Sequence, residues 1–211
     1  MNWIAQVLAV SCIGSLAVSC GGAPIAATPT PPSEEADMPT PASTLAQLML
    51  DMSSEDPAVR LVSTYALERY GEGAVVAIPQ LAVNLKDVDF DVRLAAAYVL
   101  GTLGPMAKAS VPDLVGALQT DTYFRVRAGA AESLGIIGDL SAVPALAQCL
   151  LDDYGPSHRV AIACAHSIAT ITGERFRDSD SSVYQLDDAG LPLLVLDARQ
   201  WWETSGRFMD W

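Results

Sequence analysis

One segment of the chain recurs at a nearly constant interval, and this repetition constrains the fold more than any other sequence feature. Residues Val92–Gly104 read VRLAAAYVLGTLG, and residues Val126–Gly138 read VRAGAAESLGIIG. A further copy occupies Val59–Gly71, and a more diverged copy ends at Gly173. The closing glycines of the four copies are 33, 34 and 35 residues apart. A period of this length is typical of stacked structural repeats, in which each unit packs against its neighbours.

Each repeat carries signals for two helices. The first helix opens at a proline in the second, third and fourth units, and proline suits the first helical turn because its missing N–H has no partner there. These openings are Ile78-Pro79, Val111-Pro112 and Val143-Pro144. In the second unit, the first helix is expected to run from Ile78 to about Leu85. The repeated segment forms the second helix, and its closing glycine is expected to end that helix in a left-handed conformation.

The spacing of apolar residues within the second helix separates the core from the surface. One helical face of the second unit carries Val92, Ala96, Leu100 and Leu103. The third unit repeats this face with Val126, Ala130, Leu134 and Ile137. Small residues on these helices, including Gly101 and Gly135, are expected to let neighbouring helices approach closely. The sequence therefore predicts an all-α fold, an α-solenoid of about four two-helix repeats.

The pattern D-x-x-VR-x-x-AA-x-x-LG-x-x-G, which recurs through residues 44–173, resembles the short HEAT-like repeats first recognised in phycobilisome lyases. This resemblance implies a HEAT-repeat solenoid whose second helices line a concave face. It also implies that an aspartate in each turn pairs with the arginine of the helix that follows. The pairs that match in this sequence are Asp56 with Arg60 and Asp89 with Arg93. In the third unit, Tyr123 stands where the aspartate is expected.

The fifth residue after the motif arginine should face outward from the second helix, away from the core. This column comprises Tyr65, Tyr98, Glu132 and, with a shifted register in the last unit, His166. Tyrosines on a concave surface are common anchors of protein contacts, because each offers a rigid apolar body with one polar tip. The column is therefore a candidate partner-binding surface. The alternative is that the two tyrosines cover the helix of the next repeat.

Composition and motifs argue against several classes of function. The chain has 25 acidic and 12 basic residues and a net charge of −13, which disfavours nucleic-acid binding. Its two histidines, His158 and His166, lie in no metal-binding motif, so no metal is expected. Cys149 and Cys164 are expected to pack as core thiols or, in an exported domain, to form a disulfide. The sequence predicts no catalytic residue, no cofactor and no enzymatic activity.

The first 43 residues resemble an export signal followed by a linker. Trp3–Ser19 is apolar and uncharged, and small residues precede Cys20, as in a bacterial lipoprotein signal. That resemblance implies a signal over residues 1–20, lipidation of Cys20, and attachment to a bacterial membrane on its periplasmic or extracytoplasmic side. An uncleaved anchor, an ordinary signal peptide and a soluble cytoplasmic chain are the alternatives. Residues 21–43 are proline-rich, which predicts a disordered tether.

The period stops after Gly173, and residues 174–211 are expected to form an acidic loop and a last helix. The apolar face of this helix carries Leu194, Ala198, Trp201 and Trp202. A solenoid needs such an element because its terminal repeat otherwise exposes an apolar end. Trp201 and Trp202 are therefore expected to cap the fourth unit.

These features together predict a non-catalytic scaffold that binds another protein, held at the cell envelope by a lipid anchor. The alternative is a chromophore-lyase-like or enzyme-associated subunit, which the family resemblance alone suggests. The predicted export signal argues against this alternative, because phycobilisome assembly is cytoplasmic.

Overall fold

The computed structural model describes residues 41–151, 158–177, 185–187 and 190–209. The predicted signal 1–20, its Cys20 and nearly all of the predicted tether 21–43 lie outside these residues. The described residues belong to one unit, Pro39–Trp211. Its first helix begins at Pro41, three residues before the expected start of the repeats.

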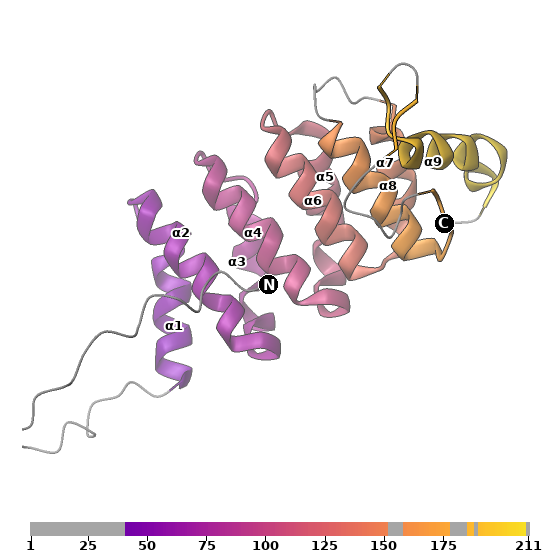
Figure 1. Cartoon of the computed structure of the whole chain (residues 1–211). Coiled ribbons are helices and arrows are strands. Elements are labelled where there is room, and N and C mark those ends of the chain that lie inside the picture. The colour runs from indigo at the N-terminus through magenta and orange to yellow at the C-terminus, as the bar shows by residue number, and fades with distance from the viewer. Residues whose placement is uncertain (1–40, 152–157, 178–184, 188–189, 210–211) are drawn as a thin grey trace, which may run out of the picture. The chain divides into compact units, whose positions relative to one another are not determined.

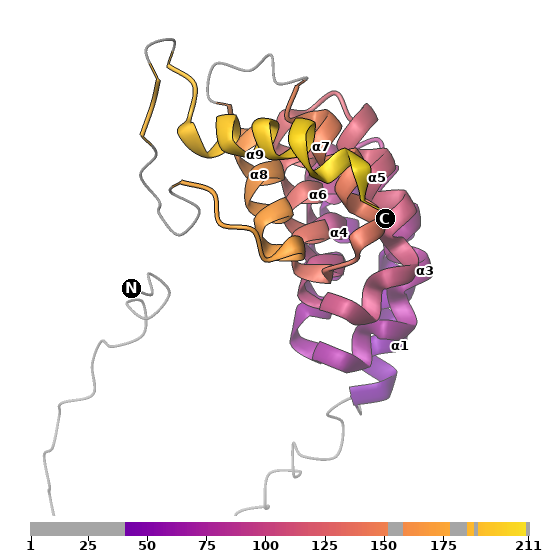
Figure 2. The same ribbon diagram turned by 90° about the vertical axis from the view of Figure 1, so that its right-hand side faces the viewer.

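The described part is a stack of helix pairs, as the sequence predicts. The helices are α1 (Pro41–Asp51), α2 (Pro57–Ala66), α3 (Ile78–Asn84), α4 (Phe90–Thr102), α5 (Val111–Thr120), α6 (Phe124–Ile137), α7 (Val143–Cys149), α8 (Arg159–Thr172) and α9 (Leu193–Thr204). The second helices of the pairs, α2, α4, α6 and α8, pack side by side in chain order (Figure 1). Figure 2 shows the first helices, α1, α3, α5 and α7, as a separate layer. The described part of the chain is an all-α solenoid with a C-terminal capping helix.

The helix starts follow the local sequence. Pro79 lies in the first turn of α3, and Pro112 and Pro144 occupy the same place in α5 and α7. Asp56 caps α2, because its carboxylate accepts a hydrogen bond from the backbone N–H of Ala58 at 2.8 Å. Asp89 caps α4 in the same way, with the N–H of Asp91 as its donor.

The closing glycines all have positive φ, but only two of them cap a helix. Gly138 and Gly173 end α6 and α8 in the left-handed conformation that was predicted. Gly71 and Gly104 instead lie in 3-10 segments, because α2 and α4 end earlier, at Ala66 and Thr102. The prediction of a left-handed C-cap is therefore wrong for the first two units.

Small residues bring neighbouring second helices into direct contact. All eight residues of the predicted core faces of α4 and α6 are buried. A Cβ atom on Gly101 would lie 2.7 Å from Oγ of Ser133, and one on Gly135 would lie 2.6 Å from Oγ of Ser167. The two serine hydroxyls also cross the interface, since Ser133 donates to the carbonyl of Ala97 and Ser167 to that of Ala131, both at 2.7 Å. Each serine thus packs against a glycine and bonds to the backbone of the preceding helix.

Arginine–aspartate pairs connect the turns of consecutive units. Arg60 on α2 forms two hydrogen bonds with the carboxylate of Asp87, each 2.7 Å long. Arg93 on α4 forms the equivalent pair with Asp121, at 2.6 and 3.1 Å. The remaining nitrogen of Arg60, Nη1, donates to the carbonyl of Ser54 in the turn before its own helix. Each arginine therefore holds its own turn and the turn of the next unit together.

This arrangement corrects the predicted pairing of Asp56 with Arg60 and of Asp89 with Arg93. Both aspartates use their side chains to cap a helix, so their carboxylates are directed at backbone N–H groups. The arginines reach forward instead, to aspartates 27 and 28 residues later in the chain. The side chains of these four paired residues are 12% exposed or less, which shields each pair from solvent.

The last helix closes the open end of the stack. Helix α9 packs against α7 and α8 and buries Leu194, Val195 and Ala198. Trp201 and Trp202 lie half-buried against the core, and the ring of Trp201 is 6.0 Å from that of Phe176. Arg199 fastens the helix to the fourth unit by donating to the carbonyl of Leu150 at the end of α7, with Nε–O 2.7 Å.

Replacing Gly135 with alanine should destabilise the stack. The added Cβ would overlap Ser167, including its backbone, and such overpacking costs about 1–3 kcal/mol. Gly116 on α5 provides a matched control, because a Cβ there meets nothing within 4 Å. Gly116→Ala should be stabilising by ~0.5–1 kcal/mol through helix propensity alone. Urea unfolding of both variants measures the two effects, and equal stabilisation by both would contradict a tight contact at Gly135.

Stability should depend on pH through Asp87. Burial by itself raises the pKa of this carboxyl, but the hydrogen bonds from Arg60 and from the N–H of Asp89 outweigh burial and lower it below its ordinary value. Because the folded-state pKa is lowered, the stabilisation is complete above the unfolded-state pKa of about 3.9 and is lost as the pH falls through the folded-state pKa.

Thermal unfolding between pH 7 and pH 2 checks this prediction with Asp87→Asn. The variant should melt about 5 °C lower at neutral pH, because Arg60 loses its partner, and the difference from the native chain should shrink in acid. Glu72→Gln is the control, since Glu72 is exposed and forms no ion pair in the described residues. A difference that stays constant from pH 7 to pH 2 would rule out the ion pair as its source.

Candidate functional site

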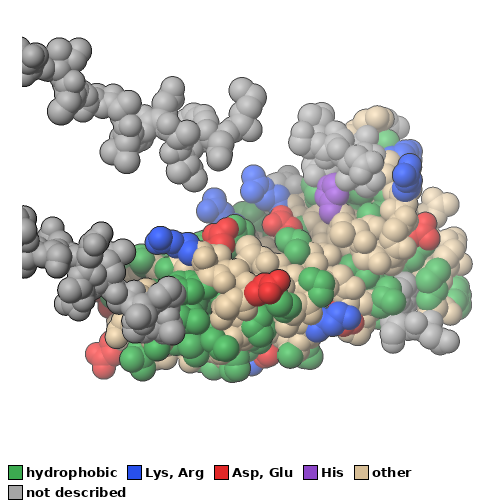
Figure 3. All heavy atoms as spheres, turned by 90° about the horizontal axis from the view of Figure 1, so that it is seen from below, with side chains coloured by type: hydrophobic (Ala, Val, Ile, Leu, Met, Phe, Trp, Pro, Cys, Tyr) green, Lys and Arg blue, Asp and Glu red, His purple; other side chains and the backbone are tan. Residues whose placement is uncertain are grey.

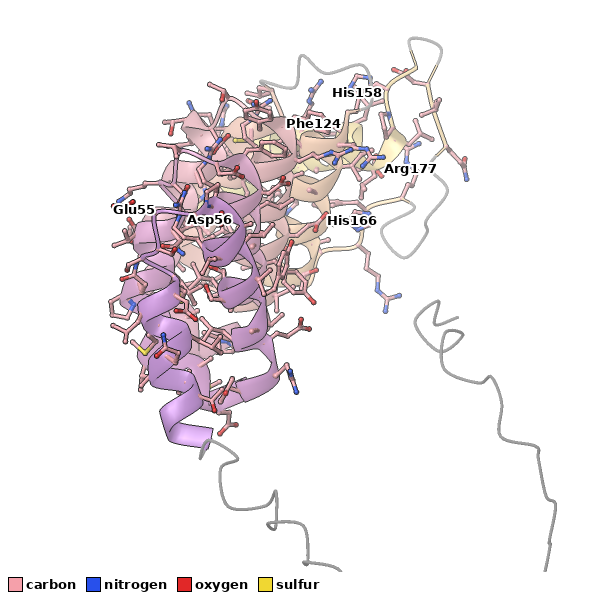
Figure 4. The ribbon with its side chains drawn as sticks, turned by 90° about the vertical axis from the view of Figure 1, so that its left-hand side faces the viewer. Glu55, Asp56, Phe124, His158, His166 and Arg177 are labelled. Carbon is pink, nitrogen blue, oxygen red and sulfur yellow. The ribbon has the colours of Figure 1, made fainter. Side chains whose placement is uncertain are left out.

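The four predicted contact residues lie on the four second helices, as the repeat register requires. Tyr65 is on α2, Tyr98 on α4, Glu132 on α6 and His166 on α8. The tyrosines are 40% and 44% exposed, Glu132 is exposed and His166 is half-buried. Figure 4 shows His166 on the side of the stack opposite to α1. The structure brings these residues together in two pairs, one in each half of the stack.

The first pair is a contact between Tyr65 and Tyr98. Their ring centroids are 6.0 Å apart and the rings are tilted by 55°. The hydroxyl of Tyr98 donates to Oε1 of Glu68 at 2.9 Å. Each tyrosine thus contacts the tyrosine of the neighbouring repeat, as the packing alternative expects, and about two-fifths of its surface stays exposed. Partner binding at this surface stays a prediction.

The electrostatics of this pair keep both phenols protonated. Partial burial, with the nearby carboxylates of Asp91 and Glu68, raises the pKa of Tyr65. The hydrogen bond to Glu68 is the main cause that raises the pKa of Tyr98. Both phenols therefore stay protonated at neutral pH, and Tyr98 already donates its one hydroxyl proton to Glu68. Glu68 was not among the contact residues predicted from the sequence. It lies three residues after Tyr65, on the following helical turn.

The second pair, Glu132 and His166, lines a groove of about 880 Å³ between α6 and α8. The other residues of this groove are Leu94, Phe124, Arg125, Ala128, Gly129, Arg159, Ile162 and Ala163. The aliphatic side chains are buried or half-buried, whereas Arg125, Glu132 and Arg159 are exposed. The groove therefore has an apolar floor and a charged rim.

Small residues make room for this groove. A Cβ atom on Gly129 would lie 2.8 Å from Cδ1 of Leu94, so a larger residue there would displace the end of the leucine side chain. Ala128 and Ala163 have short side chains that leave the space above them open. The groove was not predicted from the sequence, although one signal was present. The second residue before the motif arginine changes from Ala58 and Asp91 to Arg125, and Arg159 holds the same place before Ala161 in the last unit.

The surface near the histidine carries basic side chains. In Figure 3, blue Lys and Arg side chains line one edge of the stack, on the same side as the purple histidine. Independently of the figure, the rim of the groove carries two arginines, Arg125 and Arg159, although the chain as a whole has a net charge of −13.

Comparison with known proteins identifies the repeats. The family of HEAT repeats matches residues 78–169, which span α3 to most of α8. The chain is also similar to a solved structure of the complex of CpcE and CpcF of phycocyanin lyase from Nostoc sp. PCC7120. That similarity has 24% sequence identity and a TM-score of 0.49, and it covers 70% of this chain and 71% of the other. No curated protein matches.

The remaining candidate residues of the repeat array lie apart from the groove. Cys149 and Cys164 are both buried thiols rather than a disulfide. His158 precedes α8 with a positive φ of 48° and does not line the groove. In the described ranges, no three or more His, Cys, Asp or Glu side chains are grouped for a metal ion. Among the helices described, none has the length and apolar character needed to cross a membrane.

Proposed function

We propose that this chain is a non-catalytic scaffold that binds another protein through the exposed face of its second helices. The observation that carries this proposal is that the second helices present an exposed tyrosine pair on α2 and α4 and a groove between α6 and α8. Aromatic rings and an apolar groove with a charged rim are features that protein interfaces favour. The match to HEAT repeats supports a protein as the partner.

We further propose that the scaffold is held at a bacterial membrane through a lipid on Cys20. The support for this part comes from the sequence, in which an uncharged apolar segment ends in small residues before Cys20. A proline-rich linker of residues 21–43 would then separate the anchor from the repeats. In this arrangement the repeats would capture a partner close to the membrane surface.

The tyrosine pair can be tested by a crosslinking pull-down from the native host. Tyr65→Ala combined with Tyr98→Ala removes the exposed rings, and recovery of the specific partner should fall by about tenfold or more, as at interface anchors. Thermal unfolding monitors the fold, because the rings also contact each other. Val88→Ala is a matched control, since Val88 is 94% exposed in a turn and not on the helix face.

Unchanged recovery of every partner by a stably folded double variant would contradict a contact surface at the tyrosines. The identity of the partner carries separate information. An enzyme recovered with the native chain, and released by the double variant, would favour the alternative function of an enzyme-associated subunit.

The lipid anchor can be tested by metabolic labelling with palmitate. The native chain should incorporate label and sediment with the membrane fraction, whereas Cys20→Ser should be unlabelled. Cys12→Ser is the control, because the apolar run before Cys12 is too short for a signal. A native chain that stays soluble and unlabelled would refute the anchor and leave the scaffold proposal standing.

A further inference from the structure

Most basic side chains of the described residues already have an acidic or backbone partner. Six of them form ion pairs with aspartate or glutamate, and these are Arg60, Lys86, Arg93, Lys108, Arg177 and Arg207. Arg127 and Arg199 donate to backbone carbonyls. Four arginines, Arg69, Arg125, Arg159 and Arg175, form no ion pair or hydrogen bond within the described part of the chain, and two of them, Arg125 and Arg159, line the groove between α6 and α8. Half of the arginines without a partner in the described residues therefore lie at one surface groove of an acidic protein.

The positions of the two arginines make the same end of the groove electropositive. Arg159 is the first residue of α8 and Arg125 is the second residue of α6, so both lie in first helical turns. Tyr123, which precedes α6, makes no side-chain capping hydrogen bond, unlike Asp56 and Asp89 on α2 and α4. The partial positive charge of each helix N-terminus adds to the charge of the arginine in its first turn.

The rest of the groove limits which negatively charged ligand could bind beside the two arginines. Its floor is apolar, with Leu94 and Ile162 as its largest aliphatic side chains. Glu132 lies about two helical turns after Arg125 on α6. Its carboxylate would repel a ligand that carries negative charge along its whole length. Phe124, 42% exposed, adds an apolar wall beside Arg125. A long polyanion is also disfavoured by the net charge of −13, whereas a short segment that is acidic at one end and apolar in the middle fits.

We propose that the groove between α6 and α8 binds a short acidic segment of a partner protein, with its carboxylates at Arg125 and Arg159. An apolar side chain next to those carboxylates would cover Leu94 and Ile162. Arginine suits this role because its planar guanidinium can bind a carboxylate through two hydrogen bonds. The inference rests on the proposed scaffold function and specifies the chemistry of its partner.

The test begins with a displayed library of random short peptides, selected on the native chain from residue 21 onward. Peptides enriched on the native chain should carry aspartate or glutamate beside a leucine, isoleucine or aromatic residue. The same selection on Arg125→Glu combined with Arg159→Glu should lose this enrichment. Arg175→Glu is the matched control, because Arg175 is exposed and lies beyond the end of α8, outside the groove.

The strongest selected peptide is then labelled with a fluorophore and titrated. Arg125→Gln and Arg159→Gln should each weaken binding by about tenfold, as expected for loss of a hydrogen-bonded charge. Raising the ionic strength should weaken binding to the native chain, and a peptide with amides in place of its acidic residues should not bind. Circular dichroism and melting curves establish that each variant is folded.

Three outcomes of the selection and titration overturn the inference: no acidic enrichment on the native chain, equal enrichment on the charge-reversed variant, or a selected peptide whose affinity is unchanged by both arginine substitutions. Failure of the inference is distinguishable from failure of the scaffold proposal. If the charge-reversed variant still recovers the native partner in the crosslinking pull-down, the scaffold proposal stands and the acidic segment is refuted.

Discussion

The close contact between consecutive second helices is the constraint on which the rest of this structure depends. Where α4 meets α6, Gly101 leaves room for Ser133, and where α6 meets α8, Gly135 leaves room for Ser167. The serine hydroxyls then bond to the backbone of the preceding helix, so the contact is polar at its centre and apolar around it. Bulkier residues at these positions would separate the helices and open the core to solvent.

The ion pairs connect the same repeat units at the turns that precede the second helices. Arg60 and Arg93 each join the turn before their own helix to an aspartate of the next unit. Because these side chains are shielded from solvent, each pair stabilises the fold only if its hydrogen-bond geometry is good, which matters less for an exposed pair. Glycine contacts along the helices and arginine pairs at the turns together fix how one repeat follows the next.

This spacing also determines the exposed face on which the proposed function rests. The tyrosines of α2 and α4 come within 6.0 Å because their helices are adjacent, and the groove between α6 and α8 is formed by small residues on both helices. The face changes character along the stack, from aromatic rings beside Glu68 to a groove with two arginines. A single partner that contacts both halves would therefore need an acidic and an apolar portion.

The sequence by itself determined the repeat period, the two helices in each unit, the core face and the outward column from Tyr65 to His166. These features follow from local periodicity, because residues four and seven apart share a face of any helix. The tertiary structure alone decided which aspartate each arginine binds, since Asp56 and Asp89 are occupied as helix caps and the partners lie 27 or 28 residues away. It also decided that Arg125 and Arg159 share a groove, because the distance between two helices depends on the packing of side chains from both. Periodicity places residues on one helix, but only packing places helices against one another.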